Sequence, residues 1–199
     1  MDLGPIRAHE PIEIGGDARE ASVLVPIVER ASGPHILFTK RADHLSDHPG
    51  QMSFPGGGRE PEDGDRTATA LREANEEIGL QPEEVEIRGR LDDFETITDY
   101  AVRPFVASIA DREYTPCDDE VAEIAVLPLS ALIDPDNYES EQRDHPRYGR
   151  IRLHFFHVDG YTVWGATAAM FVQFLDLATD WELPPEPDRI VDADADLPS

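Results

Sequence analysis

One segment constrains this chain more than any other: residues 56–80, in which three consecutive glycines, an acidic loop and a helix-forming run follow one another. In the last part, Glu73, Glu76 and Glu77 have i, i+3 and i+4 spacing, so their side chains leave one face of a helix together. Like charges at this spacing repel each other by roughly a few tenths of a kcal/mol per pair. A divalent cation that prefers oxygen ligands, Mg²⁺ or Mn²⁺, would offset that repulsion. The segment therefore predicts either a metal-binding helix or a solvated acidic face.

The neighbouring residues favour an ordered and packed helix. Three apolar residues occupy its opposite side: Leu71, Ala74 and Ile78. Arg72 precedes Glu76 by one helical turn, a spacing that permits an ion pair. Asp65 or Thr67 can cap the N-terminus of the helix, and Gly79 stands where a left-handed residue ends it. A helix fixed in this way is expected to hold its carboxylates at a site.

The same segment resembles the Nudix box, the signature of the Nudix hydrolases. The second half of that signature reads Arg-Glu-apolar-x-Glu-Glu-x-Gly-apolar, and residues 72–80 match it as Arg-Glu-Ala-Asn-Glu-Glu-Ile-Gly-Leu. The first half departs from the signature, because counting from Gly58 puts Gly64 where a glutamate is expected. Counting from Gly57, with one residue inserted, puts Asp63 in that place. We interpret Asp63 as the substitute carboxylate.

The insertion of one residue is typical of the coenzyme A pyrophosphatase branch of the family. Two stretches before the box, residues 37–42 and 50–57, look like the motif that precedes the box in that branch. Four stretches after the box are also similar to it: residues 103–106, 120–124, 128–130 and 164–168. The family pattern has an arginine where this chain has Ser46, a departure that bears on the substrate and not on catalysis. The resemblance covers residues 20–178.

The resemblance implies a pyrophosphohydrolase that uses Mg²⁺ or Mn²⁺ to break the diphosphate bridge of a nucleoside diphosphate linked to another group, here coenzyme A or an acyl-CoA. It assigns the metal to Glu73 and Glu77, with Glu76 assisting. The proton of the attacking water would pass to Glu73 or to Glu120, a carboxylate outside the box. Arg72 either steadies charge in catalysis or holds Glu76 in place.

Substrate contacts are expected from residues before the helix. Arg41 would steady the charge of the substrate, and Gly56 and Gly57 would bind it while letting the backbone turn tightly. His48 either meets the substrate or stabilises its own loop. ADP-ribose and oxidised nucleoside triphosphates stay open as alternative substrates. A non-catalytic regulatory Nudix module is the alternative of another class, but it predicts a lost glutamate in the box, and all three glutamates are present.

The charge of the chain restricts its partners. The formal net charge is −25 and the pI is about 4.4, which argues against non-specific binding of DNA or RNA through phosphates. The acids are spread along the whole chain, a distribution that indicates adaptation to high salt, with an ordinary acidic protein as the alternative. The single cysteine, Cys117, excludes an internal disulfide, fits the cytoplasm and is expected to be buried.

The remaining expectations about partners concern the membrane and the assembly. The most apolar stretch, residues 164–175, is too short and too interrupted to span a bilayer. The expected partner is therefore a small-molecule nucleoside diphosphate derivative, without nucleic acid or membrane. A homodimer is left open as the assembly.

The pattern along the chain predicts an α/β fold, a Nudix-like α/β/α sandwich around a mixed sheet. Residues 1–20 are expected to form an arm or a short helix, residues 21–183 the Nudix hydrolase domain, and residues 184–199 a loose acidic tail rich in proline and aspartate. Six strands are predicted: residues 21–28, 36–39, 85–91, 102–108, 121–126 and 150–158. Besides the helix of the box, residues 164–178 predict a second major helix and residues 130–133 a helical turn.

Overall fold

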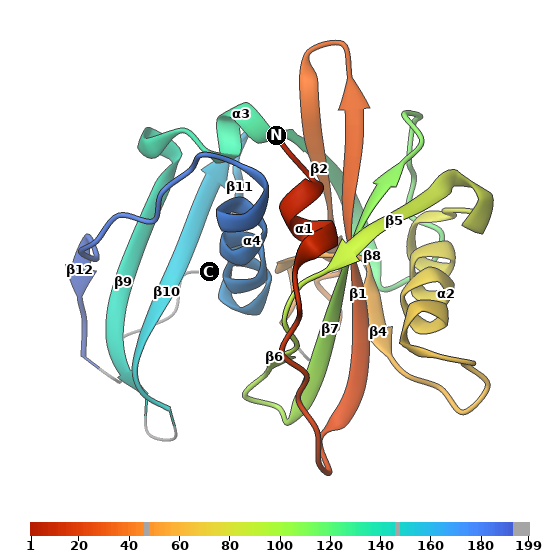
Figure 1. Ribbon diagram of the computed structural model, residues 1–199, viewed down its shortest axis with the longest axis horizontal. Helices are drawn as coiled ribbons and strands as arrows, with labels where there is room; N and C mark the ends of the chain where they lie inside the picture. Colours follow the sequence, from red (N-terminus) through yellow and green to blue (C-terminus); the bar gives the residue numbers. More distant parts are fainter. Residues whose placement is uncertain (46–47, 146–147, 193–199) are drawn as a thin grey trace.

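The computed structural model describes residues 1–45, 48–145 and 148–192 of the 199 residues. Ser46, where the family pattern has an arginine, lies outside the described residues. Figure 1 shows helix α2, a large sheet, helix α4 and a smaller sheet arranged side by side. The predicted α/β class with a mixed sheet is confirmed, and the smaller sheet adds a layer that was not predicted.

The large sheet has eight strands, which are β1 (Arg19–Arg30), β2 (Gly33–Arg41), β3 (Met52–Ser53), β4 (Gly56–Gly58), β5 (Val85–Arg90), β6 (Phe94–Glu95), β7 (Tyr100–Ile109) and β8 (Val121–Pro128). Its main path runs β3-β2-β1-β7-β5, while β4 pairs with β1, β6 with β7 and β8 with β2. The pair of β1 and β7 is parallel, and all other pairs in this sheet are antiparallel. Five of the six predicted strands lie in this sheet.

Strand β1 shows why the centre of the sheet is apolar on both faces. Leu24 and Val28 pack in the cluster that contains the inner face of α2 (Arg66–Ile78). Val25 and Ile27 pack in a second cluster with α4 (Gly165–Ala178). Because helices cover both faces, the strand reads as a nearly continuous apolar run instead of an alternating one.

The smaller sheet has the order β11-β10-β9-β12 and consists of β9 (Tyr138–His145), β10 (Gly149–Val158), β11 (Tyr161–Trp164) and β12 (Arg189–Ile190). Only β10 is predicted from the sequence. The β9 sequence is polar almost throughout, so it carries no hydrophobic alternation. It is a strand because it pairs with β10 and because Tyr138 packs against Phe156 with ring centroids 5.2 Å apart.

The remaining elements are short: α1 (Gly4–Ala8), α3 (Leu129–Leu132) and the 3₁₀ turns η1 (Pro82–Glu84) and η2 (Pro135–Asn137). The short helix expected near the N-terminus is confirmed as α1, and its Ile6 is buried in the core. The C-terminal segment differs from the expectation of a loose tail, because Arg189 and Ile190 pair with β9 and Asp188 accepts a hydrogen bond from the Ser140 backbone N–H (2.8 Å). The division into arm, domain and tail stays a prediction.

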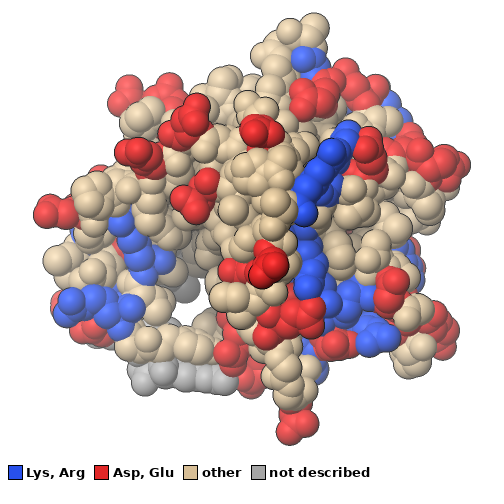
Figure 2. All heavy atoms as spheres, viewed as in Figure 1, with Lys and Arg blue, Asp and Glu red and all other residues tan. Residues whose placement is uncertain are grey.

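Acidic side chains are spread over the face of the molecule seen in Figure 2, as the composition implies. Some of the Lys and Arg side chains on that face form a band that runs downward to the right of its centre, and others lie apart from it at the left. In the described part of the chain, no helix is long and apolar enough to cross a membrane.

Candidate active site

Helix α2 begins and ends at the residues that the sequence indicates. The Asp65 carboxylate caps the N-terminus by accepting a hydrogen bond from the Ala68 N–H (2.8 Å), so Asp65 and not Thr67 is the cap. Gly79 ends the helix with φ of 64°. The inner face differs by one position from the prediction, because Leu71 is half-buried and Ala70 is fully buried beside Ala74 and Ile78. The helix rests on β1 and β4, and the carboxylates of Glu73 and Glu77 lie against the glycines of β4.

Arg72 is the centre of the charge network on α2. Its guanidinium donates to both carboxylate oxygens of Asp63, at 3.0 and 3.2 Å. It also donates to Glu76 (2.9 Å) and to the Gly58 carbonyl (2.9 Å), and it lies 3.0 Å from Glu73. The predicted pairing of Arg72 with Glu76 is therefore present. Most of the hydrogen-bonding capacity of Arg72 is used in holding neighbouring groups in place.

Asp63 is buried and satisfied by four donors. Besides Arg72, the Thr69 hydroxyl and the Glu60 N–H donate to it, each at 2.9 Å. The Arg72 guanidinium, helped by these hydrogen bonds, holds the pKa of the Asp63 carboxyl far below its ordinary value. A carboxylate that anchors the arginine of the box is consistent with reading Asp63 as the substitute for the glutamate of the signature.

Glu77 is also buried, but it has far fewer hydrogen-bond donors around it than Asp63. Its side chain accepts one hydrogen bond, from the Gly56 N–H at 3.3 Å, and only 6% of the residue is exposed. Burial, and then the charge of Glu73, raise the pKa of Glu77 to about 8. Burial also raises the pKa of Glu73, although Arg72 opposes that shift. Two adjacent carboxylates whose charged forms are poorly solvated are a suitable place for a cation.

The glycines before the helix allow the backbone to approach these carboxylates. A Cβ atom on Gly57 would lie 2.5 Å from Oε1 of Glu73, and one on Gly56 would lie 2.4 Å from the Ser22 carbonyl oxygen. Gly56 also has φ of 152°. Both positions are in β4, which pairs with β1 and so places the Gly56 N–H beside Glu77. The glycines form strand β4 instead of the predicted tight turn, after a bend at Pro55. Their predicted contact with substrate stays a prediction.

The loop before β8 brings two further acids to the site. Glu120 lies 4.0 Å from Arg41, its side chain is 61% exposed, and its charge contributes to the raised pKa of Glu73. Asp118 folds the loop by accepting hydrogen bonds from the N–H groups of Glu120 (3.0 Å) and Val121 (3.1 Å). Its charge also raises the pKa of Glu77. The structure thus brings Arg41 and Glu120 to the box, as predicted, and adds Asp118, which the sequence indicates only as part of a charged turn.

Cys117 precedes this loop and is exposed, so the expectation that it is buried is wrong. Its position is fixed by the backbone, because its N–H donates to the Glu77 carbonyl (2.9 Å). That bond ties the loop directly to the C-terminal turn of α2.

The carboxylates on α2 supply the oxygen ligands that a divalent cation prefers, but they are not arranged around a common point. Among the described residues, no three acids, histidines or cysteines lie close enough together to hold a metal as they stand. Glu76 is turned toward Arg72, with its side chain 53% exposed. Glu73 and Glu77 supply carboxylate oxygens in a partly dehydrated position, which is the ligand type that Mg²⁺ and Mn²⁺ prefer. Their role as metal ligands stays a prediction.

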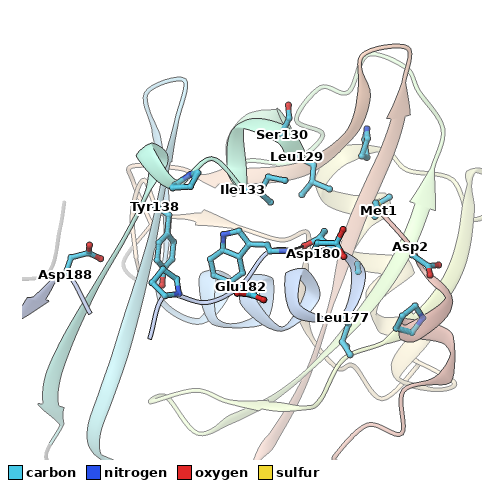
Figure 3. A pocket seen from close by; sticks show the side chains of 17 residues that line it. Met1, Asp2, Leu129, Ser130, Ile133, Tyr138, Leu177, Asp180, Glu182 and Asp188 are labelled. Atoms are coloured by element: carbon cyan, nitrogen blue, oxygen red, sulfur yellow. Dashed lines mark hydrogen bonds between the residues drawn. The ribbon is translucent and has the colours of Figure 1, made fainter. Parts of the chain in front are cut away.

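A large cavity lies away from these carboxylates. It has a volume of about 1040 Å³ and opens between α3 and the end of α4. Figure 3 shows Leu129 and Ser130 of α3 and the following Ile133 on one side of it, with Leu177, Asp180 and Glu182 across from them. It shares no residue with α2 or with the loop before β8, so its size does not make it the catalytic site.

The arrangement of a glycine strand, a capped helix and clustered glutamates agrees with a family comparison. The model of the NUDIX domain matches residues 18–148. This chain belongs to the Nudix family. The proteins named Uncharacterized Nudix hydrolase NudL from Enterobacter sp. (strain 638) and Escherichia coli (strain K12) are 40% and 38% identical to it, each over 156 residues that cover 76% of this chain and 79% of the relative. It is a Nudix hydrolase, a pyrophosphohydrolase of nucleoside diphosphate derivatives.

Solved structures of other Nudix proteins show weaker likeness. The Nudix domain of Shewanella oneidensis NrtR, solved with ADP ribose, has a TM-score of 0.48 and 16% identity and covers 58% of this chain and 76% of its own. A Caenorhabditis elegans Ap4A hydrolase has a TM-score of 0.47 and 19% identity, covering 56% and 81%. Likeness at this level carries no argument about the substrate of the present hydrolase.

Proposed function

We propose that this Nudix hydrolase cleaves the diphosphate bridge of coenzyme A or an acyl-CoA, giving 3′,5′-ADP and a phosphopantetheine product. The observation that carries the proposal is the position of Asp63. It takes the place of the glutamate only if the box is one residue longer, as in the coenzyme A branch, and Arg72 binds it through both oxygens. The stretches before the box, residues 37–42 and 50–57, support the same branch.

The residues divide the work of catalysis among them. Glu73 and Glu77, with Glu76 assisting, would hold Mg²⁺ or Mn²⁺. Such an ion, when bound, neutralises diphosphate charge and lowers the pKa of a coordinated water. Glu120 is exposed at the mouth of the site and Glu73 is half-buried within it, and either one would accept the proton of the attacking water. Arg41, close to Glu120, would meet the negative charge of the substrate.

Arg72 acts as a positioning residue in this scheme. Its contacts with Asp63, Glu73 and Glu76 orient the face of α2 that carries the metal ligands. The glycines at 56 and 57 bring the backbone against Glu77 and Glu73, at positions where a side chain would collide with Glu73 or with strand β1. We assign them to the substrate site for that reason.

Two other readings are tested by the same experiment. Hydrolysis of ADP-ribose or of oxidised nucleoside triphosphates uses the same metal site with another leaving group. A regulatory module that binds nucleotides without hydrolysing them needs no intact set of glutamates, whereas this chain retains Glu73, Glu76 and Glu77. Retention of all three favours an enzyme.

The experiment is a panel of substrates assayed with Mg²⁺ and with Mn²⁺: coenzyme A, acetyl-CoA, ADP-ribose, ATP and 8-oxo-dGTP, with products identified by mass spectrometry. We expect coenzyme A or its thioester to have the highest kcat/KM. Much faster turnover of ADP-ribose or of the triphosphates would overturn the coenzyme A assignment and leave the Nudix hydrolase intact. No turnover of any compound would favour the regulatory module.

Ser46 provides a second test of the substrate. If the family arginine contacts a phosphate, its absence removes a charge-assisted hydrogen bond of roughly 1.5–3 kcal/mol. Ser46→Arg should then lower KM for coenzyme A by about tenfold or more. An unchanged KM, together with preference for another compound in the panel, would count against the branch.

The setting of the enzyme completes the proposal. We place it in the cytoplasm of a cell with high internal salt, on the grounds of a single cysteine and a net charge of −25. The homodimer stays a prediction.

A further inference from the structure

Lys40 is the single lysine in a chain with 42 acidic residues. The arginines in the described part of the chain all have a hydrogen bond, an ion pair or a ring contact. Within that part of the chain, Lys40 alone among the basic residues has none. An unpaired ammonium in so acidic a molecule is unusual enough to suggest a ligand.

The surroundings of Lys40 explain why it is unpaired. Its neighbour on β8 is Glu123, which would be the natural partner across the strands. The Tyr161 hydroxyl donates to Glu123 instead, and this hydrogen bond raises the pKa of Tyr161. Asp43 is nearby but exposed. The ammonium group is therefore available to a ligand.

Lys40 lines a pocket of about 330 Å³ between the loop before β3 and the hairpin of β10 and β11. His48 and Gln51 contribute further polar groups, and Tyr161 and Trp164 contribute aromatic rings. A pocket of this volume is at the lower end of the range for small-molecule sites. A cation beside aromatic rings suits a phosphorylated aromatic group, because the ammonium attracts the phosphate while the rings stack on a base.

Helix α4 begins at the same pocket and adds to the attraction for anions. Trp164 is both a lining residue and the N-cap of α4, and no side chain caps the helix there. The first turn of α4 carries no acidic residue. The free N–H groups and the positive end of the helix dipole therefore face the region next to Trp164.

The pocket is close enough to the catalytic carboxylates for one substrate to reach both. Met52 lines the pocket, and Gly56, whose N–H bonds to Glu77, follows four positions later. Four residues of chain span at most about 14 Å. Lys40 and Arg41 are consecutive residues of β2 and point to opposite faces of the sheet. The pocket and the catalytic carboxylates therefore lie on opposite faces of the large sheet. Strand β3 is at the edge of this sheet, so a substrate that reaches both would pass around β3.

We propose that this pocket binds the phosphorylated nucleoside end of the substrate, with the Lys40 ammonium on a phosphate outside the diphosphate bridge and the base against Trp164. The inference rests on the proposed function, since coenzyme A carries such a phosphate at the 3′ position of its ribose. Lys40 then determines specificity between coenzyme A and 3′-dephospho-coenzyme A, and takes no part in the reaction itself.

The first test compares kcat/KM for these two compounds in the wild type, in Lys40→Met and in Arg150→Met. Arg150 is exposed on β10, so its variant removes one positive charge without touching the pocket. We expect Lys40→Met to raise KM for coenzyme A by about tenfold or more and to leave 3′-dephospho-coenzyme A nearly unchanged. Arg150→Met should leave the ratio between the two compounds as in the wild type. Equal ratios in all three proteins would overturn the inference.

The second test measures binding of 3′,5′-ADP and of 5′-AMP by calorimetry, which needs no hydrolysis. We expect 3′,5′-ADP to bind more tightly than 5′-AMP in the wild type, and equally in Lys40→Met. If the wild type fails to hydrolyse coenzyme A but shows this difference, the proposed function fails and the pocket stands. If it hydrolyses coenzyme A and the difference is absent, the pocket assignment is wrong and the function stands.

Discussion

Asp63 and Glu77, two buried carboxylates separated by the length of helix α2, have opposite surroundings and opposite pKa shifts. Asp63, before α2, is bound by Arg72, Thr69 and a backbone N–H, and its pKa is far below the ordinary value. Glu77, in the last turn of α2, has one long hydrogen bond, and burial raises its pKa to about 8. Both residues are nearly inaccessible to solvent, yet Asp63 is charged and satisfied while Glu77, which lies deeper, is poorly satisfied.

The contrast separates a structural acid from a functional one. A charge that the protein has already neutralised has little left to offer a ligand, whereas a charge buried without a partner gains stability only when a cation arrives. Arg72 thus binds Asp63 and orients the helix, and Glu77 is left with one long hydrogen bond, as the proposed metal site requires. Substitution of either carboxylate tests this difference between Asp63 and Glu77.

The largest effect is expected from Glu77→Gln, which keeps the shape of the side chain and removes its charge. We expect turnover to fall by on the order of a hundredfold or more, with the fold retained, because a metal ligand is lost. The measurement is kcat at saturating Mg²⁺, with circular dichroism to confirm folding. Glu83→Gln, at an exposed position in η1, is the matched control and should retain full activity. Near-normal turnover in Glu77→Gln would remove Glu77 from the mechanism.

Asp63→Asn is expected to lower the free energy of unfolding, which is a more direct effect than any change in turnover. The change weakens the contacts to Arg72 and leaves part of a buried network unsatisfied, at a cost of about 1–3 kcal/mol in the free energy of unfolding. Urea denaturation measures it, with Glu62→Gln, an exposed neighbour, as the control. If Asp63→Asn unfolds at the same urea concentration as the wild type, Asp63 is not the structural acid of the pair.

The pH dependence of stability should sharpen the same contrast in metal-free protein. Glu77 has a higher pKa folded than unfolded, so the stability associated with its proton is present below about pH 4.5 and is lost as the pH rises through about 8. The melting temperature should fall over that interval less steeply in Glu77→Gln than in the wild type. Adding Mg²⁺ at pH 8 should raise it in the wild type and much less in the variant. Parallel pH profiles for the two proteins would contradict the raised pKa.

The smallest expected effect is that of salt on the melting temperature, and it arises from charges over the whole surface. The repulsion among surface acids should weaken as the screening length falls to about 3 Å at 1 M salt, so the melting temperature should rise between dilute buffer and molar KCl. Asp63→Asn and Glu77→Gln should rise in parallel with the wild type, since buried charges are screened much less. A flat or falling melting temperature in the wild type would count against adaptation to high salt.

The sequence predicts α2 well because local chemistry determines it. The cap at Asp65, the ion pair of Arg72 with Glu76 and the left-handed Gly79 depend on residues within a few positions of each other. The same holds for the large sheet, in which apolar strands are separated by recognisable turns. The identification of Asp63 depends on a resemblance, and the Arg72 contact agrees with it.

The features that the sequence does not reveal depend on distant partners. Strand β9 is polar and becomes a strand through β10, and the segment at 188–191 is ordered through its bonds to β9. Asp118 reads as a turn residue, and only the fold places it near Glu77. Cys117 is exposed because the chain carries it past the end of α2, where its N–H donates to the Glu77 carbonyl. Local patterns contain no signal for these long-range contacts.

The single lysine has a practical consequence for chemical labelling. Apart from the α-amino group of the chain, Lys40 carries its one primary amine, so an amine-reactive fluorophore at alkaline pH would mark the pocket beside Trp164 and little else. A bound ligand would protect Lys40 from such a reagent, so the extent of labelling would report on occupancy of that pocket. Reductive methylation, which usually modifies many surface positions, would here leave the rest of the molecular surface unaltered.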